Sequence, residues 1–120
     1  MAAGVTYYWG FDLAVDAAGF SLVITRGAYT YTITVADFAT TTFYQPLSDA
    51  DGYTGFAAAL QVAIRAEGVA VGDPQAADWV ITWTHSVLTF TLYHPTGAYT
   101  AVLSADAQHV LGLDASLASS

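Results

Sequence analysis

Residues 79–103 read WVITWTHSVLTFTLYHPTGAYTAVL, and hydroxyl and apolar side chains alternate along most of this stretch. An alternation of period two predicts β-strands with one face on a core and the other face outward. The threonines share one face, at Thr82, Thr84, Thr89 and Thr91. The other face is apolar and carries Trp79, Ile81 and Trp83, then Leu88, Phe90 and Leu92. The stretch therefore predicts a hairpin that turns at His85-Ser86, and the turn sequence HPTG then leads into a third strand, AYTAVL.

Residues 20–35 predict another hairpin, with its turn at Arg26-Gly27. On its second strand the apolar face is Tyr29, Tyr31, Ile33 and Val35, and the threonine face is Thr30, Thr32 and Thr34. The two hairpins look alike, LVIT…TYTITV against WVIT…TFTLYH. An internal duplication accounts for this likeness, and so does a Thr-rich amphipathic pattern that arose twice.

One amphipathic helix is predicted over residues 54–67, because Phe56, Leu60 and Ile64 recur at the spacing of one helical face. Thr54 is the expected N-cap of this helix, and Gly68 is the expected C′ residue that ends it. A short helical turn capped by Ser104 is predicted over 105–111.

These elements predict a single α+β domain over residues 1–120, a length typical of one domain. We expect an antiparallel β-sheet, or sheets, made of two hairpins and an added strand and packed on the 54–67 helix. The short helical turn over 105–111 comes after the last strand. Residues 1–19 are expected to form an N-terminal strand or arm, and residues 115–120 a frayed tail.

The charge of the chain restricts its partners. Two Arg, no Lys and ten acidic residues give a net charge of −8, which disfavours nucleic acid and anionic membrane surfaces. No apolar run reaches the length of a membrane helix, and the N-terminal MAAGVTYYWG lacks the basic region of a signal peptide. The chain has no Cys, so neither disulfides nor thiolate chemistry can be predicted.

Charged residues make up only 10% of the chain, whereas about 25% is usual. Surface covered by other subunits accounts for this deficit, because the cores of interfaces lose charges and gain aromatic residues. The composition of a GC-rich coding sequence accounts for it equally well. Tyr7, Tyr8 and Trp9, together with the outward threonines Thr82, Thr84, Thr89 and Thr91, are the residues that we expect at an interface.

No residue pattern predicts catalysis or a cofactor. Asp49 and Asp51 resemble the start of a calcium loop, but the end ligands of such a loop are missing, so helix N-terminal charges are the simpler interpretation. His85, His94 and His109 are too widely spaced for a zinc site. No nucleophile motif or phosphate loop occurs, and we expect no enzyme, no metal and no cofactor.

The order of the elements resembles a small module of tailed-phage and other viral structural proteins. The resemblance covers residues 28–114 and rests on a Thr-rich strand, GYTGFAAALQVAIRAEG, then DWVITWTHSVLTFTLYHPTGAYTAVL, and a closing SADAQHVLGLD. This sequence departs from the module in two places, with Gly112-Leu113 where the module closes on Gly-Phe and with only His85-Ser86 at the turn of the second hairpin. The resemblance implies a virion component such as a capsid decoration, minor capsid, tail or baseplate protein, whose partners are other virion proteins and copies of itself.

Three classes of function therefore stand side by side. The first is a non-enzymatic structural subunit of a phage virion. The second is a carbohydrate- or receptor-binding module that uses exposed aromatic residues, and an enzyme comes third. Buried contact between low-charge surfaces of neighbouring chains would favour the first class, and a pocket with two convergent titratable groups would favour the third.

Overall fold

The computed structural model describes residues 13, 17–38, 44–45, 54–84, 89–96, 98–111 and 116–118, and it confirms the α+β class. The strands are β1 (Ser21–Arg26), β2 (Tyr29–Thr34), β3 (Tyr44–Gln45), β4 (Thr54–Gly55), β5 (Val80–Thr84), β6 (Thr89–Tyr93), β7 (Thr100–Leu103) and β8 (Ser116–Ala118). The helices are α3 (Phe56–Ala70) and α4 (Ala105–Leu111), with short 3-10 turns η1 (Val35–Asp37) and η2 (Ala76–Asp78).

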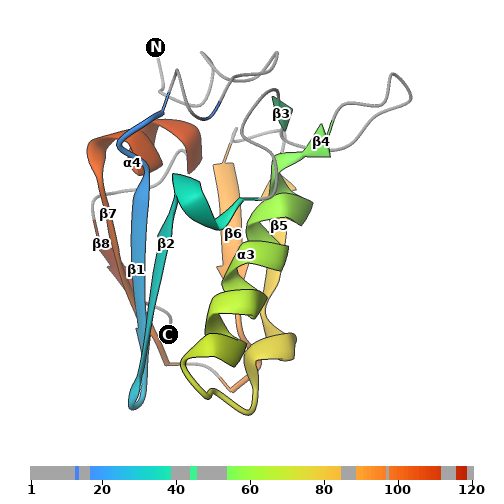
Figure 1. The fold of residues 1–120 in the computed structure, drawn as a ribbon, viewed down its shortest axis with the longest axis vertical. Helices are drawn as coiled ribbons and strands as arrows, with labels where there is room; N and C mark the ends of the chain where they lie inside the picture. Colours follow the sequence, from blue (N-terminus) through green and yellow to red (C-terminus); the bar gives the residue numbers. More distant parts are fainter. Residues whose placement is uncertain are drawn as a thin grey trace.

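The larger sheet has four antiparallel strands in the order β2-β1-β7-β8. Its first two strands are the predicted hairpin, which turns at Gly27 and Ala28. Gly27 has a φ of +60°, a conformation that favours glycine. The predicted third strand, β7, leaves the second hairpin and pairs with β1 instead (Figure 1). Segments far apart in the sequence are thereby joined into one sheet.

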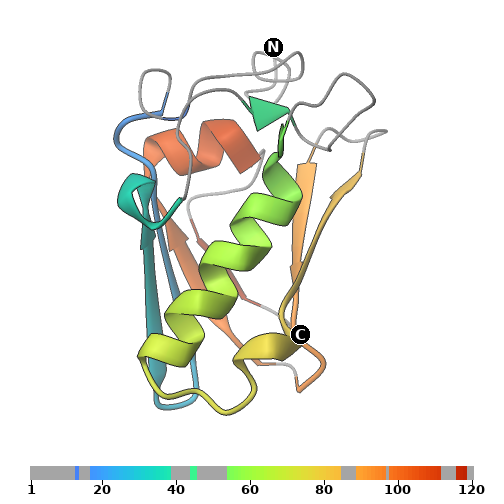
Figure 2. The same cartoon turned by 45° about the vertical axis from the view of Figure 1, so that its right-hand side comes forward.

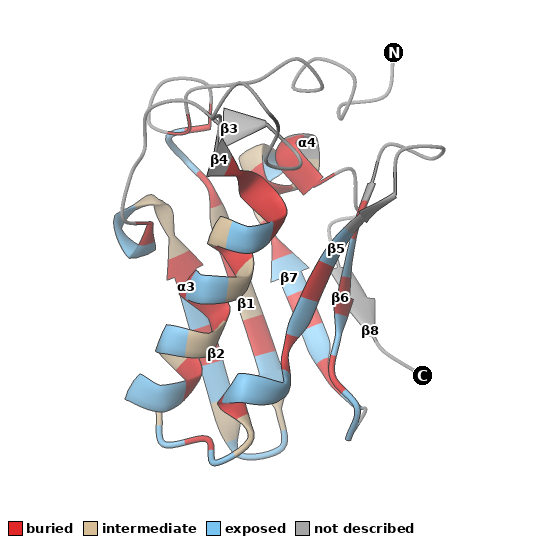
Figure 3. Ribbon diagram, turned by 90° about the vertical axis from the view of Figure 1, so that its right-hand side faces the viewer, coloured by how far each residue is buried: buried red, intermediate tan, exposed pale blue. Residues whose placement is uncertain are grey.

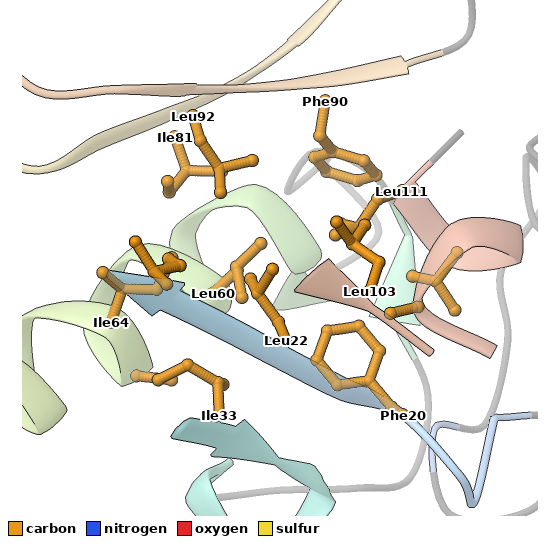
Figure 4. Packing of buried hydrophobic residues seen from close by; sticks show 14 of the residues in the cluster. Phe20, Leu22, Ile33, Leu60, Ile64, Ile81, Phe90, Leu92, Leu103 and Leu111 are labelled. Atoms are coloured by element: carbon orange, nitrogen blue, oxygen red, sulfur yellow. The ribbon is translucent and has the colours of Figure 1, made fainter. Parts of the chain in front are cut away.

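The second hairpin, β5–β6, forms a separate two-stranded sheet. Helix α3 lies between the two sheets at the front of the molecule, with β1 and β2 to one side of it and β5 and β6 to the other (Figure 2). Buried side chains from all three layers meet in one core (Figure 4). The labelled members include Phe20, Leu22, Ile33, Leu60, Ile64, Ile81, Phe90, Leu92, Leu103 and Leu111.

The strand faces follow the predicted alternation. Ile81, Phe90 and Leu92 are buried, whereas Thr82 and Thr91 are exposed. In the first hairpin Tyr31 and Ile33 are buried, and the threonines of the same strand face outward or are partly covered. A period of two therefore sorts these side chains correctly, but Tyr29 is only half-buried, and Val35, predicted on the same strand face, lies in the 3-10 turn η1. The structure describes only the backbone of Trp83, and the other predicted inward residue, Leu88, and the predicted turn at His85-Ser86 lie outside the described residues.

The predicted bounds of the helix are wrong at both ends. Gly55, rather than Thr54, is the N-cap, because Thr54 pairs with Tyr44 in the short parallel β3–β4 ladder. The helix continues past Gly68 to Ala70, and Gly72, with a φ of +83°, is the C′ residue. Gly68 serves close packing instead: a Cβ on it would lie 2.5 Å from the Ala76 Cβ and 2.8 Å from the Tyr31 hydroxyl oxygen.

The chain ends also differ from the prediction where they are described. Ser116–Ala118 forms β8 on the outer side of β7, although a frayed tail was predicted there. Three residues carry too little alternation to reveal a strand, and β8 exists because β7 offers it a free edge. Leu13 has a helical conformation, is fully buried, and accepts a hydrogen bond from Ala17 N–H, although a strand or arm was predicted. The helical turn over 105–111 is confirmed, and the Ser104 hydroxyl accepts the Ala107 N–H as a cap.

Candidate functional site

The hairpin face is the outward side of β5–β6 and consists of Val80, Thr82, Thr91 and Tyr93. Val80 lies opposite Tyr93 and Thr82 opposite Thr91 across the two strands. All four side chains are exposed, and Tyr93 is 55% exposed. Thr84 and Thr89 form the next backbone pair of the same register, so two of the four predicted threonines are shown to be exposed and the other two continue the ladder.

A second uncharged surface covers the outside of the larger sheet. This sheet face consists of Val23, Thr25, Thr30, Thr32, Thr100 and Val102. The strand register arranges it in two rows: one row holds Thr30, Thr25 and Thr100, and the other holds Thr32, Val23 and Val102. Flat rows of threonine and valine favour strand structure and cross-strand contact but provide no charge.

The hairpin face and the sheet face point away from each other. Ile81 and Leu92 extend from the hairpin into the core, and Leu22 of β1 extends into the same core from the opposite layer (Figure 4). Since successive side chains of a strand point to opposite sides, the outward residues of the two sheets lie on opposite sides of the molecule. The chain therefore presents two separate uncharged faces.

None of the described acidic residues belongs to either face, and several of them bind backbone N–H groups. Asp37 accepts the Thr34 N–H at 2.7 Å, and Glu67 of α3 accepts the Thr32 N–H at 3.3 Å. Both N–H groups belong to the open edge of β2, so two carboxylates cover an edge that another strand could otherwise join. Asp106 accepts the Gly19 N–H at 2.7 Å in the same manner.

The two arginines are also used inside the domain. The Arg65 Nε donates to the Trp79 carbonyl at 2.9 Å, next to the Gln61 side-chain oxygen, which accepts the Ile81 N–H at 3.1 Å. Both contacts link α3 to the edge of β5. Arg26, at the end of β1, binds Asp73 with two nitrogens.

Asp73 reaches Arg26 because of how α3 ends. The Gly72 N–H donates to the Val69 carbonyl, and the Asp73 N–H donates to the Gly68 carbonyl, which is the Schellman pattern. This turn directs the Asp73 side chain toward the first hairpin. Asp73 is buried there, with an exposed fraction of 4%. One carboxylate oxygen accepts hydrogen bonds from Arg26 and the Gln75 N–H, and the other accepts from Arg26 and the Tyr31 hydroxyl.

These contacts determine the ionisation of the cluster. Burial alone would raise the pKa of Asp73, but the hydrogen bonds from Tyr31, Arg26 and the Gln75 N–H outweigh it and hold that pKa below its usual value. Burial raises the pKa of the Tyr31 phenol, and the hydrogen bond to Asp73 adds to this increase. Asp73 is therefore a carboxylate, and Tyr31 a neutral donor, at neutral pH.

His94 extends the cluster to the end of β6. Its Nε2 lies 3.0 Å from the Gln75 carbonyl, and its Nδ1 lies 3.3 Å from the Thr96 nitrogen. A carbonyl only accepts and a backbone N–H only donates, so these contacts assign the proton of the neutral ring to Nε2. The His94 ring packs 5.0 Å from the Trp79 ring. His94 was predicted to begin a turn, and its buried side chain also holds that turn on the core.

One polar cluster holds three parts of the fold together, and its members are Arg26, Tyr31, Asp73, Gln75, His94 and Thr96. It joins the tip of the first hairpin, the end of α3 and the end of β6. Each oxygen of Asp73 already accepts two hydrogen bonds, so neither is left to bind a substrate or remove a proton. Sequence reasoning missed this cluster, because a lone Asp after Gly72 looks like any turn residue.

The other predicted site residues lie elsewhere. Tyr7, Tyr8 and Trp9, the Asp49–Asp51 segment and His85 are outside the described residues. Within the described ranges no group of three or more His, Asp or Glu side chains is arranged to hold a metal ion. Among the described helices, none combines the length and apolar character needed to cross a bilayer.

Comparisons of the chain with protein-family models, with curated proteins and with solved structures find no match.

Proposed function

We propose that the chain is a non-enzymatic structural subunit of a bacteriophage virion, either a capsid decoration or minor capsid protein or a tail or baseplate subunit. The assignment to a virion rests on the order of its sequence motifs, which resembles that of small viral structural modules. In this proposal the neighbours are other virion proteins and copies of the same chain.

The observation that supports assembly is the absence of charge from the hairpin face and the sheet face. A chain with a net charge of −8 would be expected to spread its carboxylates over solvent-exposed strands. Here three described acidic side chains, Asp37, Glu67 and Asp106, bind backbone N–H groups of strand edges and turns instead, and the outward strands carry Thr, Val and Tyr. Interface cores have this composition, with few charges and with aromatic residues.

A carbohydrate- or receptor-binding module has less support. Among the described aromatic residues, Trp79, Tyr31 and Tyr99 are buried, and Tyr7, Tyr8 and Trp9 lie outside the described residues. Tyr93 is the exposed aromatic side chain of the hairpin face, and its neighbours Val80, Thr82 and Thr91 fit a protein partner better than a sugar ring.

Mass spectrometry of density-purified particles, produced from the genome that encodes this chain, tests the proposal. The proposal expects the chain in the particles in a fixed ratio to the major structural proteins, and resistant to a high-salt wash. Recovery of the chain only from the particle-free supernatant would contradict it.

A further inference from the structure

The outward side of α3 has an unusual composition for a surface helix. Four of its exposed positions form one stripe, which we call the helix stripe: Ala58, Val62, Ala66 and Val69. Val62 is 66% exposed and Val69 is 73% exposed. Figure 3 shows this side of the helix as exposed along much of its length. A surface helix normally carries polar or charged residues there.

The polar residues of α3 do not cover the helix stripe because they bind the neighbouring strands. Gln61 and Arg65 bind the backbone of β5 and its preceding residue, and Glu67 binds the Thr32 N–H of β2. All three polar side chains of the 15-residue helix are thus committed to strand backbones. Valine forms helices less readily than Lys, Glu or Ala, so helix propensity does not account for Val62 and Val69 at exposed positions.

From this arrangement we infer that the helix stripe is a contact surface for a second copy of the chain, with the two α3 helices packed antiparallel about a two-fold axis. The inference rests on the proposed function, since it names one of the neighbours in the assembly. A symmetric pair is the commonest way for identical chains to associate.

Two copies of the helix stripe can pack with the larger side chains of one against the smaller side chains of the other. When the two-fold axis passes between positions 62 and 66, Val62 of each copy lies against Ala66 of the other, and Val69 lies near Ala58. Large side chains thus meet small ones along the contact, and the alanines allow the helices to approach closely.

Charge is compatible with a second copy at the helix stripe. Two chains that each carry −8 repel one another wherever carboxylates meet, and the helix stripe carries none. A basic partner would gain nothing from this uncharged stripe and would bind the acidic parts of the surface instead. The helix is only about 22 Å long, so the stripe alone covers less than the roughly 800 Å² per partner of a standard interface, and the pair should depend on concentration.

Sedimentation analysis over a concentration series tests the inference with three variants. The wild-type mass should rise from 12.6 kDa toward twice that value, and Val62→Glu should move the midpoint to at least about tenfold higher concentration. Glutamate favours helix more than valine does, so the variant should keep its fold. Ala98→Glu adds the same charge at an exposed residue between β6 and β7 and should follow the wild type.

The third variant, Val80→Glu, separates this inference from the proposed function because it charges the hairpin face. Suppose that Val80→Glu weakens the association and Val62→Glu leaves it unchanged. That result would overturn the helix contact but would still agree with assembly through the β faces. Equal curves for Val62→Glu and Ala98→Glu, or a wild type that stays at the mass of one chain, would also overturn it. Detection of the chain in purified particles is independent of all these results.

Cross-linking tests the register directly, because the chain contains no cysteine. An oxidised mixture of Val62→Cys and Ala66→Cys chains should give the mixed dimer at least about tenfold faster than a mixture of Val62→Cys and Ala98→Cys chains, since a disulfide requires Cα atoms within about 7 Å. Equal rates for the two mixtures would exclude the antiparallel pair.

Discussion

Hairpin β1–β2 is part of a four-stranded sheet, whereas hairpin β5–β6 pairs with no third strand among the residues that the structure describes. The tip of the first hairpin is fixed by the ion pair of Arg26 with the buried Asp73. The second hairpin is held by its apolar face and by the hydrogen bonds from Gln61 and Arg65 of α3. Similar amphipathic sequences thus receive very different support, and an isolated two-stranded sheet is marginal without packing.

This difference indicates which part of the domain can be displaced most easily. The β2 edge is covered by Glu67 and Asp37, so the first hairpin is closed to further strands. On the outer edge of β6 the Leu92 carbonyl accepts the Tyr99 hydroxyl at 2.6 Å, which protects one position of that edge. The second hairpin is therefore the less firmly held of the two, and it carries the hairpin face.

The largest loss of folding stability is expected from Asp73→Ala, which removes the buried carboxylate that holds the tip of the first hairpin. The change leaves the Arg26 guanidinium and the Tyr31 hydroxyl without their buried partner. Removal of one member of a buried pair costs about 3–5 kcal/mol. Urea unfolding should show this loss, while Asp78→Ala, at an exposed acidic residue nearby, should change stability by less than about 0.5 kcal/mol. A similar stability for both variants would refute the assigned role of the cluster.

Gly68→Ala should have the next largest effect, because it forces α3 away from the first hairpin. An alanine usually stabilises a helix relative to glycine. Here the added Cβ meets Ala76 and the Tyr31 hydroxyl, and overpacking of this kind costs about 1–3 kcal/mol. Thermal unfolding should therefore show a lower midpoint, and the double variant Gly68→Ala/Ala76→Gly should recover part of it. A midpoint above that of the wild type would show that the contact relaxes freely.

A smaller effect is expected from Gln61→Ala, which weakens the support of the second hairpin. The Ile81 N–H loses its acceptor, at a cost of about 1 kcal/mol. Glu67→Ala is the matched change at the first hairpin, where the contact is longer and exposed, and should cost less than about 0.5 kcal/mol. Native-state hydrogen exchange should show faster exchange of the Ile81 amide in Gln61→Ala. Equal costs for the two variants would remove the distinction between the hairpins.

The smallest change in unfolding free energy should come from mild acid, which protonates the same Asp73. Its pKa is lower in the folded chain than in the unfolded one, so its contribution to stability is present above the unfolded value, near 4, and is lost as pH falls toward the folded value. Between about pH 4 and pH 3 only part of that contribution titrates. The unfolding free energy of the wild type should fall over this range more steeply than that of Asp73→Asn, and parallel slopes would contradict the assignment.

Strand alternation and helical spacing in the sequence were sufficient to predict the faces of both hairpins, the amphipathic helix and the outward threonines Thr82 and Thr91. The helix end was not predictable, because Gly68 and Gly72 are both credible C′ residues and the choice depends on how Tyr31 packs. The Arg26–Asp73 pair joins residues 47 apart in the sequence, and no local pattern links them. The helix stripe was hidden for another reason: Gln61, Arg65 and Glu67 made the helix look normally amphipathic.

The central claim is that neighbouring subunits cover the uncharged outer faces, and competition for incorporation into particles tests it most directly. Wild-type chain and a Thr82→Asp/Thr91→Asp variant would be supplied in equal amounts during assembly, with Ala98→Asp against wild type as the control. The account predicts that particles take up the wild type at least about tenfold over the doubly charged variant, and that Ala98→Asp is incorporated equally with the wild type. Equal incorporation of the doubly charged variant would contradict the claim.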